Sequence, residues 1–142
     1  MKLFSKVALM LLCLLSVACK KETDPSVLLY TTIVNDSHHM VSVSMVENTL
    51  KGDTLSFVLL PGEKYDIKNR TTLVKVLEAT VTFDNNITVI HELTGDSTPE
   101  GFRNICYTKW WETRQEDVKG EVRLLHIFTF TDDDYEYAAQ SK

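Results

Sequence analysis

Two adjacent tryptophans, Trp110 and Trp111, are the side chains of this sequence most suited to contacting a ligand. They fall in a run, Ile105–Thr113, that is predicted to be a strand, where consecutive side chains face opposite ways. One indole should then lie in the core and the other at the surface, with Tyr107 nearby. An exposed aromatic ring can stack on a sugar or anchor a protein interface. The alternative is that both indoles pack, one in the core and one under a loop at 92–101.

The histidines and acidic residues do not form a recognisable metal site. His38 and His39 are adjacent, so on a strand they would point to opposite sides and could not readily chelate one ion. A zinc site that also used His91 would need tertiary contacts, and His126 alternates with apolar residues, as expected at the edge of a core. The acidic triplet at 132–134 lacks the spacing and the glycine of a calcium loop and favours a helix start. We expect no metal and no cofactor.

The sequence also lacks an evident catalytic set. Cys106 could act as a nucleophile only beside a base, and nothing in the sequence places one there, so we expect a small buried side chain. No G-x-S-x-G, P-loop, dinucleotide-binding glycines or C-x-x-C is present. Paired carboxylates could hydrolyse a glycoside, but a small sandwich leaves little room for a cleft. We therefore expect a protein that is not an enzyme.

The first 18 residues are predicted to be a signal peptide. Two lysines precede an apolar segment, 7–15, which is shorter than the roughly 18–20 residues that span a bilayer. Small residues then lead into Cys19. Residues 19–26 are polar and contain a proline, which is typical of a flexible tether, and a single domain is expected at 27–142.

The net charge of the chain argues against a nucleic-acid partner. The 142 residues carry a formal charge of −5, and residues 1–18 contain two lysines and no acidic residue, so the remaining 124 carry about −7. That length is enough for one hydrophobic core and short for two packed domains.

The segment Leu15–Cys19 resembles the lipobox of bacterial lipoproteins, although Ser16 stands where leucine is commonest. The resemblance implies cleavage before Cys19, diacylglycerol on its thiol and a further acyl chain, such as palmitate, on its amine. Two or three acyl chains hold a soluble domain stably at a membrane. The lysines and acidic residues of 20–24 are similar to the export signal of surface lipoproteins in the Bacteroidota. That similarity implies the outer membrane, with the domain facing the cell surface or the periplasm.

Alternation with period two dominates the rest of the sequence. Val41, Val43 and Met45 alternate with serines, and a further run ends at Pro61-Gly62, which suits a type II turn with positive φ at the glycine. In a hairpin at 79–91, a three-residue loop would set Phe83 opposite Ile87 and Val81 opposite Val89, whereas a two-residue loop would mix the two faces. Asn86 is expected in the left-handed conformation there.

Seven or eight such strands predict an all-β fold, with a small barrel as the alternative to a sandwich. We expect a single antiparallel immunoglobulin-like β-sandwich with a short C-terminal helix capped by Thr131. The run at 122–131 has two apolar faces, so it should lie centrally in its sheet. The pieces LLPGEKYDI, VTFDNNITV, Arg103-Asn104-Ile105 and FTFTDDDYEYA resemble a group of small Bacteroidota lipoproteins of unknown function. This resemblance implies a β-sandwich and carries no known site.

Two short motifs, Asp53-Thr54-Leu55 and Asp96-Ser97-Thr98, resemble the acceptor motif for protein O-glycosylation in the Bacteroidota. The resemblance implies Thr54 and Ser97 as acceptors.

Taken together, these features favour a lipid-anchored, non-enzymatic binding or accessory module with an envelope protein or a glycan as its partner. Two alternatives stay open. One is a small hydrolase, or an inhibitor of one, that acts through the Trp110/Trp111 region. The other is a structural component of an outer-membrane assembly.

Overall fold

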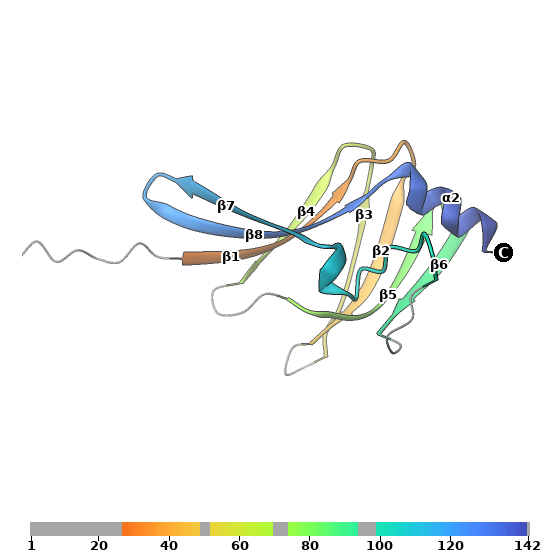
Figure 1. Cartoon of the computed structure of the whole chain (residues 1–142), viewed down its shortest axis with the longest axis horizontal. Helices are drawn as coiled ribbons and strands as arrows, with labels where there is room; N and C mark the ends of the chain where they lie inside the picture. Colours follow the sequence, from red (N-terminus) through yellow and green to blue (C-terminus); the bar gives the residue numbers. More distant parts are fainter. Residues whose placement is uncertain (1–26, 49–51, 70–73, 94–98, 142) are drawn as a thin grey trace, which may run out of the picture.

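The computed structural model describes residues 27–48, 52–69, 74–93 and 99–141, and they form two β-sheets and a short C-terminal helix (Figure 1). The helix is α2 (Asp132–Gln140), and a turn of 3₁₀-helix, η1, spans Thr108–Trp110. No helix among these residues is long and apolar enough to cross a membrane. The strands are β1 (Val27–Asn35), β2 (Val41–Glu47), β3 (Thr54–Leu59), β4 (Lys64–Asn69), β5 (Val76–Phe83), β6 (Ile87–Glu92), β7 (Glu112–Val118) and β8 (Glu121–Phe130).

The strands divide equally between the two sheets. Sheet A has the order β4-β1-β8-β7, and sheet B has the order β3-β2-β5-β6. The expected central place of the 122–131 strand is confirmed, because β8 lies between β1 and β7. The expected antiparallel arrangement is wrong at one pair, since β1 and β8 run parallel. Parallel neighbours need a long crossover connection, and here almost the whole domain lies between the first and last strands.

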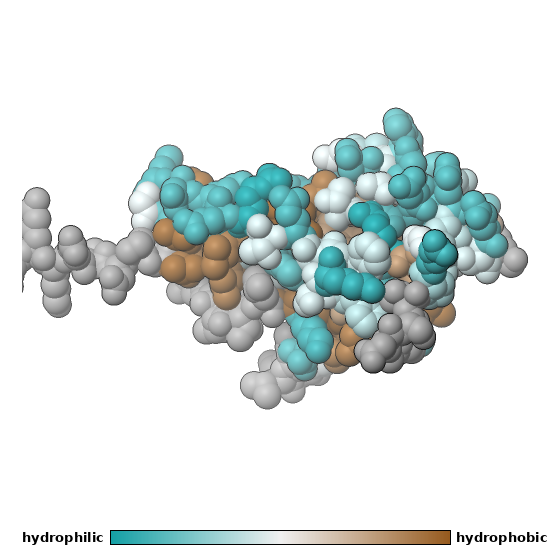
Figure 2. Space-filling view, in the orientation of Figure 1, coloured by the Kyte–Doolittle hydropathy of each residue, from teal (hydrophilic) through white to brown (hydrophobic). Residues whose placement is uncertain are grey.

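The hydrophobic core lies between the sheets. Ile33 of β1 and Phe128 of β8 face Val43 and Val81 of sheet B, and all four side chains are almost inaccessible to solvent. Beyond this core, the β7–β8 hairpin and the start of β1 extend past the strands of sheet B (Figure 1). Figure 2 shows hydrophobic surface gathered beneath that hairpin. Val27, the first residue of β1, is 47% exposed.

The predicted register of the β5–β6 hairpin is confirmed. Phe83 pairs with Ile87, and Val81 pairs with Val89. The expectation for the loop is wrong in one detail, because Asp84 and Asn85 have positive φ values and Asn86 does not. Asp84 is held there because its carboxylate accepts hydrogen bonds from the backbone nitrogen of Met40 and from the His39 ring.

The predicted strand at 105–113 is wrong, because β7 begins only at Glu112. Asn104 explains the difference: its Oδ1 accepts a hydrogen bond from the Cys106 amide at 2.9 Å, and its Nδ2 donates to the Glu92 carbonyl. A local side-chain bond of this kind competes with the strand ladder and starts a turn. The turn continues into η1, so Trp110 lies on a 3₁₀-helix.

A predicted turn and a predicted helix cap are confirmed. The Glu63 amide donates to the Leu60 carbonyl across Pro61-Gly62, and Gly62 has a φ of +82°. At α2, Thr131 and Asp134 form a capping box in which each side chain accepts from the other residue's backbone amide.

Candidate functional site

An aromatic group with one lysine lies at η1, and we call Tyr107, Lys109 and Trp110 the aromatic–lysine patch. The Lys109 Nζ lies 5.1 Å from the centre of the Trp110 ring and 5.8 Å from that of Tyr107. An ammonium group at such distances from an aromatic face is attracted to the ring quadrupole. Both aromatic rings are partly buried, and their contacts with the core hold them in position.

Trp111 has a different role from its neighbour. Its Nε1 donates a hydrogen bond to the Ile105 carbonyl at 2.8 Å, and its ring stacks on His126 with centroids 4.7 Å apart. The ring also packs at a tilt against Phe128 in the core. These contacts make Trp111 a support of the fold.

The two tryptophans therefore differ in their contacts. The prediction that they lie on opposite faces of a strand is wrong, because neither belongs to a strand. Both lie against the core and both are partly exposed. The Trp110 Nε1 is buried and has no hydrogen-bond partner among the residues that the structure describes. Trp110 consequently contributes fewer stabilising contacts to the fold than Trp111 does.

A second group of polar side chains, the histidine–carboxylate cluster, lies where the β1–β2 connection meets α2 and the β5–β6 turn. It contains His38, His39, Asp84, Asp132 and Tyr135. The His38 Nδ1 lies 2.7 Å from the Asp132 carboxylate, and the His39 Nδ1 lies 2.6 Å from that of Asp84. The His39 ring stacks on Tyr135 at 3.5 Å. Both histidines occupy a bend between β1 and β2, so the strand geometry used to argue against a shared metal ion does not apply to them.

The hydrogen bonds of this cluster shift the pKa values of His38, Asp84 and Asp132. The hydrogen bond with Asp132 raises the pKa of His38, and the bonds from the His38 amide and ring lower the pKa of Asp132. The hydrogen bond with His39 likewise lowers the pKa of Asp84. The hydrogen bonds of the cluster thus join three segments that are distant in the sequence.

Two further titratable groups are buried at the 99–106 segment: His91 of β6, which contacts it, and Cys106 within it. Burial lowers the pKa of His91 to about 4, and the His91 Nδ1 accepts a hydrogen bond from the Ile105 amide. Burial raises the pKa of the Cys106 thiol to about 12, and Glu78 and Glu92 add to the effect. Cys106 is 3% exposed, so the expected small buried side chain is confirmed. Its thiol stays protonated at neutral pH and is a poor nucleophile there.

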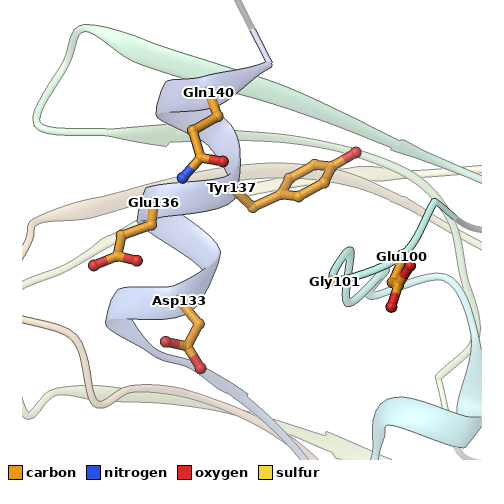
Figure 3. Close-up of a pocket in the computed structure, with 6 residues that line it drawn as sticks. All are labelled: Glu100, Gly101, Asp133, Glu136, Tyr137 and Gln140. Carbon is orange, nitrogen blue, oxygen red and sulfur yellow. The ribbon is translucent and has the colours of Figure 1, made fainter.

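A shallow pocket of about 330 Å³ lies between α2 and the 100–101 turn (Figure 3). Tyr137 extends from the helix toward the turn, and its ring stacks on Phe102. Glu100, Asp133 and Glu136 line the pocket with Gly101, Tyr137 and Gln140. Its acidic lining has no buried polar group to hold a ligand in a defined orientation.

The remaining predicted sites fall at the surface or outside the structure. Thr54 is exposed at the first position of β3. Ser97 and Cys19 lie outside the described residues. Within the described ranges, no three His, Cys, Asp or Glu side chains are grouped so that they could hold a metal ion.

Sequence reasoning missed Lys109 and the His39–Asp84 pair. Lys109 is one position from Trp110, so a basic residue beside an aromatic pair was a usable signal. The partners His39 and Asp84 are 45 residues apart, and only the folded chain brings them together.

Comparison with known proteins gave no match: no protein-family model, no curated protein and no solved structure is similar to this chain. The fold and the two side-chain groups described above are therefore the basis for a functional proposal.

Proposed function

We propose that this chain is a lipid-anchored protein of a bacterial outer membrane whose immunoglobulin-like β-sandwich serves as a non-enzymatic binding module. Support for the anchor comes from the sequence, in which a signal-like segment ends at Cys19. The described domain begins at Val27, and the intervening residues are polar, as a tether requires. In this proposal the domain faces either the cell exterior or the periplasm and offers a binding surface there.

The observation that carries the binding role is the aromatic–lysine patch. Trp110 offers an indole that is supported by the core, and the Lys109 ammonium lies 5.1 Å from its centre. Aromatic faces stack on the apolar faces of sugar rings, and an ammonium group pairs with a carboxylate. A glycan that carries acidic sugars fits both groups, and an acidic segment of an envelope protein is the second candidate.

Titration of the full-length protein in detergent with carboxylated and neutral oligosaccharides tests the proposal, with the heat of binding measured by calorimetry as the signal. We expect Trp110→Ala to weaken binding about tenfold, because the stacked ring is lost. The carboxylated sugars should bind more tightly than the neutral ones, and Lys109→Gln should remove that preference.

Tyr30→Ala is the matched control. Tyr30 also lies beside cationic groups, with the Lys68 Nζ 6.0 Å and the Arg123 guanidinium 5.7 Å from its ring centre, but it belongs to β1 in sheet A. Equal losses in the Trp110 and Tyr30 variants would contradict the proposed site. Hydrolysis of any oligosaccharide by the wild-type protein would contradict a purely binding role.

A further inference from the structure

The four edge strands of the two sheets differ in how they are protected from pairing with other strands. An open edge offers unpaired amide and carbonyl groups, and proteins protect it with charges or by covering it. In sheet A, β4 carries Lys64, Asp66 and Lys68, and β7 carries four charged side chains in seven residues. In sheet B, α2 packs against β6, and Asn104 donates a hydrogen bond to the Glu92 carbonyl at its end.

The edge strand β3 has neither kind of protection. Its sequence, TLSFVL, contains no charged residue. It pairs with β2 along its whole length, and no other strand of the described residues pairs with its opposite edge. Val58 is 54% exposed, and Leu60, directly after the strand, is 52% exposed. An uncharged edge of six residues is therefore open to a further strand.

We propose that a second copy of this chain docks on this edge, with the two β3 strands antiparallel about a two-fold axis at Phe57. In that register, Leu55 of one copy lies opposite Leu59 of the other, and the two Phe57 residues lie opposite each other. All of these residues belong to the core-facing side of β3, so the apolar side of sheet B continues across the axis. Val58 then faces Ser56 of the other copy on the outer side.

Charge is the reason for choosing a second copy as the occupant. In a two-fold interface the same patch meets itself, so every charge in the patch approaches its own equivalent. The formal charge of the chain is −5, and acidic copies repel each other over most of their surface. Pairing through β7 would bring its three acidic side chains into one contact, whereas β3 itself carries no charge.

Sedimentation of the full-length protein in detergent tests the proposal with a pair of matched variants. We expect a concentration-dependent dimer in the wild type, and Val58→Lys should shift it to monomer because two ammonium groups would then lie near the axis. Ile90→Lys is the control. The Ile90 side chain is 56% exposed, and it belongs to β6, the other edge strand of the same sheet, against which α2 packs. Both positions are exposed in one copy, so neither substitution disturbs the core.

Disulfide trapping tests the register independently of the sedimentation result. Directly opposed residues of antiparallel strands are within reach of a disulfide. A mixture of Ser56→Cys and Val58→Cys proteins should therefore form a mixed disulfide on mild oxidation, and Ile90→Cys should not crosslink with either.

Three outcomes would overturn the proposal. The first is a monomer at all concentrations, and the second is a dimer that survives Val58→Lys or is lost equally in Ile90→Lys. The third is a monomer whose β3 amides become protected from hydrogen exchange only when another envelope protein is added, which would make a foreign strand the occupant.

Discussion

His91 is 2% exposed and burial lowers its pKa to about 4, whereas an unfolded histidine titrates near 6.5. Between these values the unfolded chain binds a proton that the folded chain excludes, so the free energy of unfolding falls as the pH falls from 6.5 to 4. The shift corresponds to about 3 kcal/mol. Urea unfolding at pH 7 and pH 4.5 should show this loss, and His91→Gln, which can still accept from the Ile105 amide, should reduce it.

His38→Gln is the control for that prediction, because its effect has the opposite sign. The pKa of His38 is raised, so its pair with Asp132 stabilises the fold below pH 6.5 and is lost as the pH rises through the raised value. Asp132 and Asp84 have lowered pKa values and stay ionised at pH 4.5. An unchanged acid slope in His91→Gln would show that this histidine is not the group that titrates.

Arg103 joins the 99–106 segment to the start of α2. Its guanidinium forms an ion pair with Asp134, whose side chain is 8% exposed, and its Nε donates to the same carboxylate at 3.1 Å. Removal of the cation leaves that carboxylate buried with only its capping bonds to Thr131. We expect Arg103→Met to lower the free energy of unfolding by about 3 kcal/mol, as measured by urea denaturation.

Arg114→Met is the matched control, because it removes an arginine from an ion pair that is exposed. Arg114 pairs with Glu112 on the edge strand β7, where the two side chains are 55% and 62% exposed. Exposed pairs contribute about 0–1 kcal/mol, so this variant should unfold close to the wild type. If both variants lost the same stability, the Asp134 contact would be of no special importance.

Elements whose pattern is local could be predicted, and contacts between distant segments could not. Alternation of period two gave the register of Val81 and Val89, because a shift by one residue would expose the core face. The parallel β1–β8 pair has no such signal, since period two is the same in both directions. The strand expected through Trp110 failed because one side chain, Asn104, bonds to its own backbone and starts a turn.

The same distinction applies to the candidate site. The choice of Tyr107 and Trp110 followed from residue type, and the structure brings them together around Lys109. The structural role of Trp111 depends on His126, which is 15 positions away along the chain and reaches it only through the β7–β8 pairing. No periodicity in the sequence encodes that contact.

The molecule as a whole has two distinct ends. Val27 and the β7–β8 turn lie at one end, and α2 lies at the other (Figure 1). Residues 19–26 span about 28 Å at most when fully extended, which is comparable with the hydrocarbon thickness of a bilayer. We infer that the proposed anchor at Cys19 would keep the β7–β8 end near the membrane, with α2 and the histidine–carboxylate cluster facing away from it.

The anchor itself is tested by Cys19→Ala. We expect this variant to move from the membrane fraction to the soluble fraction of the cell, because it lacks the thiol that we propose as the acceptor of the diacylglycerol. Cys13→Ala is the matched control: Cys13 lies within the apolar segment before the predicted cleavage point, and its replacement should leave the fractionation unchanged. Membrane association that persists in Cys19→Ala would refute the lipid anchor.

The orientation is tested with a fluorophore at either end of the lipid-bound protein. Lys119→Cys places a thiol in the β7–β8 turn, and Gln140→Cys places one on the last residue of α2. Cys106 stays unlabelled in the folded protein, because it is 3% exposed and its pKa is about 12. In vesicles with a quencher on the lipid headgroups, the label at 119 should be quenched more strongly than the label at 140. Equal quenching would mean that the tether lets the domain tumble freely, and the reverse order would place α2 against the bilayer.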